Sequence, residues 1–206
     1  TKTKINNYMY VFGNGESRQG FDVSRCYGPK VGCNGIMRDY KMDHLVCVDR
    51  RMVEESIERG VNQHTIVYTR YDWFPRYKKH TNIRQLPDLP YKGDERWDEP
   101  FQWGSGPYAV LIAAQKAKNE TVHLIGFDQY SSTLKVNNIY KDTRNYDRAD
   151  KRAVDPRYWI HQIGKVFECY AKTNFVVYDL HEKMKKAWNY PNVSLDKLSN
   201  IRYNSN

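Results

Sequence analysis

Short apolar runs alternate with longer amphipathic stretches along this chain. Runs typical of buried strands occupy residues 7–12, 31–33, 44–49, 65–68, 121–125 and 174–180. Apolar positions at helical spacing predict helices over residues 51–59, 106–119 and 156–173. Gly60 is placed to end the first helix and Pro107 to begin the second. Strands that alternate with helices favour an α/β fold with a mainly parallel sheet, covered by helices on both faces.

Two long stretches lack a core pattern. Residues 71–103 contain Pro75, Pro87, Pro90 and Pro100, so we expect a loop with room for one short helix. Residues from about 131 to 155 are polar and carry tyrosines, which is typical of a mobile lid. Because 206 residues correspond to about one domain, we expect a single α/β domain over residues 1–206 with a lid insertion at about 131–155.

Composition indicates a soluble globular protein. Hydrophobic residues make up 40% of the chain, and no apolar run approaches the roughly 18 residues that a membrane span requires. The segment 1–4 leads directly into a short apolar strand and lacks a signal-peptide core, so we expect a cytoplasmic protein with no transmembrane segment. Four cysteines without Cys-x-x-Cys spacing favour reduced thiols over a zinc site.

The formal net charge of +9 raises the question of nucleic-acid binding. The 33 lysines and arginines are interleaved with 24 acidic residues, and no motif that reads nucleic-acid sequence accompanies them. We therefore expect no specific nucleic-acid partner. The charge favours a general attraction to anionic ligands such as nucleotides and phosphorylated sugars.

Polar residues follow the predicted strands where parallel sheets bind their ligands. The candidates are Gly13, Asn14, Gly15, Asn34, Asp49, Asp128 and Tyr130. Gly13-Asn14-Gly15-Glu16-Ser17 follows the first strand, and its glycines would allow close approach of a phosphate. The loop lacks the third glycine of the dinucleotide fingerprint, and a plain strand-to-helix turn is the alternative.

The first turns of the two long helices carry residues suited to anion binding or to acid–base chemistry. Ser105 and Gly106 open the central helix, where free amides favour an anion, although Ser105 is also a typical N-cap. Tyr158 and His161 lie in the first turns of the later helix, and a histidine is the usual base near neutral pH. A packed or surface histidine is the alternative. With no Asp-x-Asp pair, nothing in the sequence supports a metal site.

Taken in order, five short motifs resemble those of the bacterial lipooligosaccharide sialyltransferases, a Rossmann-like family with a small lid. They are Gly13-Asn14-Gly15-x-Ser17, Cys33-Asn34, Ser105-Gly106-x-Tyr108, Gly126-Phe127-Asp128-x-Tyr130 and Tyr158-x-x-His161. Their order and approximate spacing hold from about residue 8 to 180. The resemblance implies a metal-independent transferase that moves an acidic sugar from a CMP-activated donor to a glycan-type acceptor.

The resemblance also implies residue roles. The residues that would bind the donor are Gly13, Asn14, Gly15, Ser17, Asn34, Asp49, Ser105, Gly106 and Asp128. His161 would be the general base, while Tyr130, Tyr140 and Tyr158 would stabilise the departing phosphate, with no cofactor beyond the CMP-sugar donor. Phenolic donors and a helix N-terminus suit the charge that develops on such a leaving group.

Two positions depart from the family, and they keep alternatives open. Asp49 stands where the sialyltransferases carry asparagine, and residues 101–103 lack the arginine expected before Ser105. Asp49 is closer to the pattern of the related hydroxymethylpterin pyrophosphokinase-like and flagellin accessory proteins, which would use ATP and Mg²⁺. A nucleotide- or glycan-binding module without turnover is the third interpretation, and a homo-oligomer is compatible with each.

Overall fold

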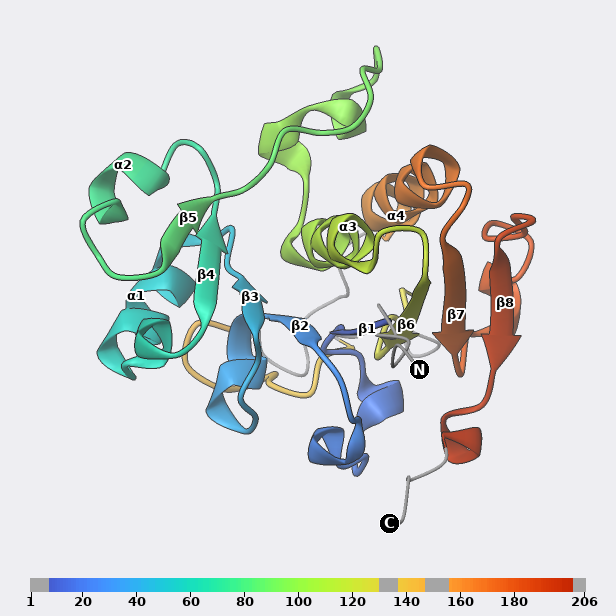
Figure 1. Ribbon diagram of the computed structural model, residues 1–206, viewed down its shortest axis with the longest axis horizontal. Helices are drawn as coiled ribbons and strands as arrows, with labels where there is room; N and C mark the ends of the chain where they lie inside the picture. The colour runs from blue at the N-terminus through green and yellow to red at the C-terminus, as the bar shows by residue number, and fades with distance from the viewer. Residues whose placement is uncertain (1–7, 130–136, 147–155, 202–206) are drawn as a thin grey trace, which may run out of the picture.

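An eight-stranded sheet organises the computed structural model, which describes residues 8–129, 137–146 and 156–201 (Figure 1). Its strands are β1 (Met9–Phe12), β2 (Lys30–Cys33), β3 (His44–Val46), β4 (Ile66–Thr69), β5 (Ile83–Gln85), β6 (Thr121–Ile125), β7 (Asn174–Tyr178) and β8 (Val193–Asp196). The order across the sheet is β5-β4-β3-β2-β1-β6-β7-β8, and each neighbouring pair is parallel. The expected α/β fold with a mainly parallel sheet is confirmed.

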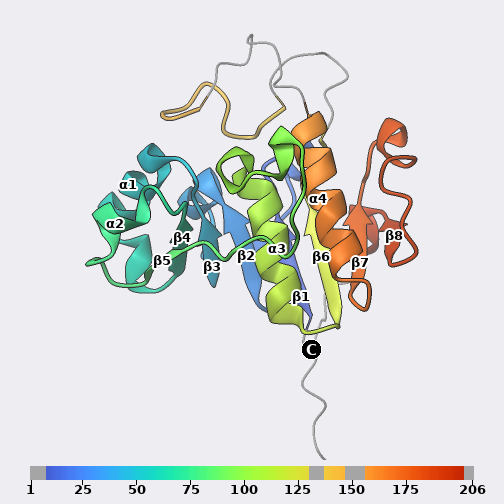
Figure 2. The same cartoon turned by 90° about the horizontal axis from the view of Figure 1, so that it is seen from above.

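Helices cover both faces of this sheet. They are α1 (Arg50–Glu58), α2 (Phe74–Tyr77), α3 (Ser105–Ala117) and α4 (Arg157–Cys169). Side chains alternate along a strand, so Val11 of β1 packs in the core beneath α3 and α4, while Phe12 packs in the core beneath α1. Figure 2 shows α3 and α4 side by side on one face. No helix in the described ranges has the length and apolar character needed to cross a membrane.

The chain reverses its direction of travel across the sheet beside β1. From β1 it proceeds through β2, β3 and β4 to the edge strand β5, then returns through α3 to β6 on the other side of β1. β1 is therefore paired with both β2 and β6. In open parallel sheets, ligands bind at this point of reversal, outside the carboxyl ends of the strands. The fold thus brings the ends of β1, β2 and β6 together.

Local sequence explains the limits of the helices. Asp49 is the N-cap of α1, and its carboxylate accepts the amide hydrogen of Arg51 at 2.9 Å. Gly60 follows the helix with a φ of 69°, in the left-handed region that glycine adopts at little cost. At α3 the N-cap is Gly104, and Ser105 is the first helical residue. The alternative that Ser105 caps this helix is therefore wrong.

Two strands lie outside the expected pattern. β5 falls within the proline-rich stretch, together with α2, and β8 follows a region with no prediction. Both are edge strands. Ile83 is the buried residue of β5, and the side chains of β8 from Ser194 to Asp196 are exposed. An edge strand that buries so little apolar surface has weak periodicity, so pairing with the sheet decides its conformation.

Candidate functional site

The glycine loop packs against the loop that follows β6. The amide of Gly13 donates to the carbonyl of Ile125 at 2.8 Å, and the amide of Gly15 to the carbonyl of Gly126 at 2.9 Å. A Cβ added at Gly13 would lie 2.4 Å from the carbonyl oxygen of Gly126, so glycine is needed for this approach. Both glycine amides are therefore used within the fold.

The rest of this loop is anchored in the same way. The Ser17 amide donates to the Asp128 carboxylate at 3.0 Å, and the Ser17 hydroxyl bonds to the same carboxylate. The Glu16 amide donates to the side-chain oxygen of Asn137 at 2.8 Å. A three-residue 3₁₀ turn, Glu16–Arg18, follows the loop in place of an α-helix. A ligand at these amides would have to displace the bonds they already make.

The ends of β1 and β2 and the start of α3 meet through polar side chains. Asn14 donates its amide to the carbonyl of Cys33 at 2.9 Å. The hydroxyl of Ser105 lies 3.3 Å from the side-chain oxygen of Asn34 and accepts from the amide of Val48 at 3.1 Å. Asn34 and Ser105 are thus in contact, and Asn14 bonds the residue immediately before Asn34.

Asp49 is engaged locally. Its carboxylate pairs with the Arg51 guanidinium at 2.9 Å in addition to capping α1. Burial acts to raise the pKa of Asp49, but the hydrogen bonds from Arg51 outweigh it and lower the pKa. The carboxylate is therefore ionised at neutral pH and already paired, which limits the repulsion expected beside a phosphate.

Arg18 is a residue of this edge that the sequence analysis missed. It is 3% exposed, and its guanidinium donates to the Gly13 carbonyl at 2.7 Å, the Asn14 side chain at 2.9 Å and the Tyr140 hydroxyl at 3.3 Å. Tyr140 in turn donates to Asp39 at 2.7 Å, and burial raises the pKa of Tyr140 to about 12. Arginine is rarely buried, so residue type alone suggested a surface position.

The described part of the predicted lid, residues 137–146, crosses the carboxyl ends of the strands (Figure 2). The Tyr146 hydroxyl accepts the Gly35 amide at 2.7 Å. Arg38 donates to Thr143 at 2.7 Å and also pairs with the buried carboxylate of Glu55 at 2.6 Å. The rest of the lid, with Tyr130, lies outside the described residues.

His161 is held by a carboxylate from the proline-rich stretch. Its Nε2 lies 2.7 Å from Oδ1 of Asp98, and its ring stacks on Trp97 with centroids 4.7 Å apart. Asp98 also accepts the Tyr91 hydroxyl at 2.7 Å. Burial acts to raise the pKa of Asp98, but hydrogen bonds from Tyr91 and His161 outweigh it and lower the pKa. Tyr158 meets Trp97 edge to face at 5.7 Å.

Asp98 was also missed, because it lies in a stretch without periodicity and 63 residues before its partner. Gln162 of α4 helps to position it. The Gln162 side chain donates to the carbonyls of Trp97 and Gln102 at 3.1 and 3.0 Å. Three side-chain hydrogen bonds thus hold residues 97–102 against α4.

Arg70, at the end of β4, places a cation beside the segment that precedes Ser105. Its guanidinium carbon lies 4.0 Å from the ring centroid of Phe101, and it donates to the Phe101 carbonyl at 3.3 Å. The carboxylate of Asp72 orients it through bonds of 2.6 and 2.8 Å. Residues 101–103 contain no arginine, but the fold places the guanidinium of Arg70 beside them.

The fold and these edge residues define an α/β protein with a doubly wound parallel sheet. Within the described residues, no group of three or more His, Cys, Asp or Glu side chains is arranged to hold a metal ion. No family model, curated protein or solved structure matches the chain.

Proposed function

We propose that this protein is a glycosyltransferase of sialyltransferase type, which moves an acidic sugar from a CMP-activated donor to an acceptor hydroxyl. The contact between His161 and Asp98 carries the proposal. A carboxylate that accepts from Nε2–H orients the imidazole and leaves Nδ1 to take the proton from the acceptor. Asp98 also stabilises the imidazolium that forms.

The donor would bind across the reversal point of the sheet. Asn14, Asn34 and Ser105 gather at that edge, and their amide and hydroxyl groups suit a ribose and a phosphate. Arg70 supplies a cation next to the same edge, which suits the carboxylate of an acidic sugar.

The leaving phosphate would be stabilised by phenolic hydroxyls. We assign this role to Tyr130, Tyr140 and Tyr158, because hydrogen-bond donors aimed at developing charge lower the barrier. Tyr140 already bonds Arg18, so a phosphate that reached this hydroxyl would also approach a guanidinium. No step of this scheme requires a metal ion.

A binding module without turnover is the second candidate. It is favoured by the glycine loop, where the amides of Gly13, Gly15 and Ser17 already bond to groups of the fold. Such a protein would bind a nucleotide or a glycan through side chains and form no product.

The test combines ligand binding with transfer. Thermal shifts with CMP, CDP, UDP, GDP and ATP, each with and without Mg²⁺, identify the nucleotide. A ligand at ~100 times its dissociation constant should add about 2.7 kcal/mol, a shift of roughly 5–11 °C. Selective stabilisation by CMP supports the transferase, whereas stabilisation by ATP only with Mg²⁺ supports a pyrophosphokinase-like enzyme. CMP binding without transfer to any acceptor supports the binding module.

The base is tested by three variants. His161→Ala should bind CMP normally and lose transfer by about 10²–10⁴-fold, while the exposed His80→Ala should match the wild type. Asp98→Asn should lower transfer by about 10–100-fold, since the imidazole loses the carboxylate that orients it. Full transfer by His161→Ala would remove the proposed base.

A further inference from the structure

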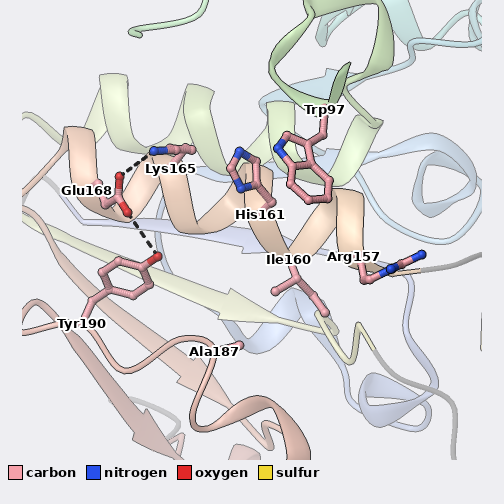
Figure 3. Close-up of a pocket in the computed structure, with 8 residues that line it drawn as sticks. All are labelled: Trp97, Arg157, Ile160, His161, Lys165, Glu168, Ala187 and Tyr190. Carbon is pink, nitrogen blue, oxygen red and sulfur yellow. Dashed lines mark hydrogen bonds and ion pairs between the residues drawn. The ribbon is translucent and has the colours of Figure 1, made fainter. Parts of the chain in front are cut away.

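One side of His161 faces a pocket that runs along the outer side of α4 (Figure 3). The pocket has a volume of about 370 Å³, and its lining includes His161, Lys165 and Glu168 of α4 and Trp97 of the proline-rich stretch. The side chain of His161 is 25% exposed, whereas that of its partner Asp98 is 5% exposed. The imidazole is therefore accessible from the pocket, while the carboxylate that holds it is buried.

The segment from Tyr91 to Asp98 is folded around this carboxylate. The Tyr91 hydroxyl donates to Oδ1 of Asp98 at 2.7 Å, and the same oxygen lies 2.7 Å from Nε2 of His161. The backbone amide of Glu95 donates to Oδ2 at 3.1 Å. Both carboxylate oxygens are thus hydrogen-bonded, and Tyr91 and Glu95 both lie within seven residues of Asp98 along the chain.

Gly93 allows the chain to pass close to the same carboxylate. A Cβ added at Gly93 would overlap Oδ2 and Cγ of Asp98. An aspartate at the surface could turn away from such a contact. Asp98 can turn away only by breaking its bonds to Tyr91, Glu95 and His161. The absence of a side chain at Gly93 is therefore needed for the observed position of the carboxylate.

The ionisation of these groups fixes the direction of each hydrogen bond. Burial raises the pKa of Tyr91, so its hydroxyl stays protonated and donates. Burial acts to raise the pKa of Asp98 as well, but its hydrogen bonds outweigh this effect, so the carboxylate is ionised and only accepts. When His161 is neutral, its hydrogen must lie on Nε2, which leaves Nδ1 as the basic nitrogen.

We infer that Tyr91 and Gly93 are positioning residues, which hold the Asp98 carboxylate where it keeps the hydrogen of neutral His161 on Nε2. Both act through Asp98, since neither is among the residues that line the pocket. The benefit for transfer rests on the proposed function, in which Nδ1 of His161 takes the proton of the acceptor. The position of the hydrogen rests on the contacts around Asp98 alone.

The position of this hydrogen is measured without any substrate. Proton–nitrogen correlation spectra of protein labelled with nitrogen-15 histidine distinguish the two tautomers at about pH 9, where imidazole is neutral. His161→Ala identifies the signals of His161. The wild type should show the tautomer with hydrogen on Nε2. In Gly93→Ala the two nitrogen resonances should move toward each other, as the tautomers mix, and Tyr91→Phe should give a smaller change in the same direction.

Tyr77→Phe is the matched control. Tyr77 also donates to a carboxylate at 2.7 Å, that of Glu54, so this variant removes an equivalent bond elsewhere. It should leave the His161 resonances unchanged. Tyr91→Phe keeps the ring that packs 6.2 Å from Trp103, so its effect does not depend on a loss of packing. Unchanged His161 resonances in both Tyr91→Phe and Gly93→Ala overturn the inference.

Transfer kinetics provide a second measurement. Tyr91→Phe should lower kcat about 3–10-fold with little change in the KM for the donor, because the hydroxyl orients the base and does not touch the donor. Gly93→Ala should approach the loss of about 10–100-fold expected for Asp98→Asn. Tyr77→Phe should stay within about twofold of the wild type. An effect of Tyr91→Phe on KM alone would contradict a positioning role.

The two proposals fail separately. If the His161 resonances respond as expected while CMP does not bind and no transfer is found, the transferase fails and the positioning role stands. If transfer occurs and requires His161, but Tyr91→Phe and Gly93→Ala keep both the wild-type resonances and the wild-type kcat, the positioning role fails and the transferase stands.

Discussion

The carboxyl edge around β1 and β6 and the pocket along α4 both gather polar side chains, but they use them differently. At the edge, the amides of Gly13 and Gly15, the guanidinium of Arg18 and the carboxylate of Asp128 each bond to another group of the fold. Along α4, charged groups remain accessible and pair at the surface. Buried hydrogen bonds are costly to break, whereas exposed ion pairs contribute little to stability. Polar residues at the edge therefore support the structure directly, and the exposed ion pairs along α4 contribute less to it.

The largest expected effect comes from substituting Glu55 of α1, the partner of Arg38. The carboxylate of Glu55 is 2% exposed and pairs with Arg38, which also anchors residues 143 and 144. Glu55→Gln leaves a nearly buried guanidinium without its charge partner, so we expect a loss of about 3–5 kcal/mol in the free energy of unfolding at pH 7. Urea denaturation measures it. The exposed Glu58→Gln should change stability by less than about 1 kcal/mol.

This effect depends on pH with a defined sign. Hydrogen bonds from Arg38 lower the pKa of Glu55 in the folded state. The pair therefore stabilises the protein above the unfolded-state pKa of about 4.3, and this contribution is lost as pH falls through the folded-state value. The stability difference between wild type and Glu55→Gln should begin to shrink as pH falls below about 4.3 and should disappear only below the lowered folded-state pKa of Glu55. An equal difference between them at pH 7 and pH 3.5 would contradict the ionic origin.

The second-largest effect is expected at Gly126, where the loop after β6 contacts the glycine loop. Gly126 has a φ of 79°, and a Cβ there would lie 2.5 Å from the Gly13 carbonyl oxygen. Gly126→Ala should cost about 2–4 kcal/mol, from backbone strain and overpacking together. Gly20 has a φ of 81° with open space around it, so Gly20→Ala should cost only about 1 kcal/mol. Equal losses in chemical denaturation would show that the loops do not need this close contact.

The smallest expected effect is the change in stability when Lys165 of α4 is substituted. Lys165→Gln removes one partner of an exposed pair, so the free energy of unfolding should change by less than about 0.5–1 kcal/mol. Thermal denaturation of the variant and the wild type measures this change. A large loss of stability would place Lys165 among the residues that hold the fold.

Part of the site could be predicted from the sequence. The order of strands and helices places residues such as Asn14 and Asn34 at the carboxyl ends of strands, which parallel sheets bring to one edge. Residues without a pattern could not be placed. Arg18 bonds to Tyr140, 122 residues away, and His161 bonds to Asp98, 63 residues away. Nothing in local spacing marks such pairs.

The sequence by itself determined the α/β architecture, because the period of apolar residues follows the geometry of each strand and helix. Only the tertiary structure decided how the polar residues are used. In the folded protein, the amides of Gly13 and Gly15 donate to carbonyls at the end of β6 and just after it. Ser105 bonds to Val48 and Asn34, and Asp98 bonds to His161. Periodicity is a local property of the chain, whereas hydrogen-bond partners depend on which distant segments the packed sheet brings together.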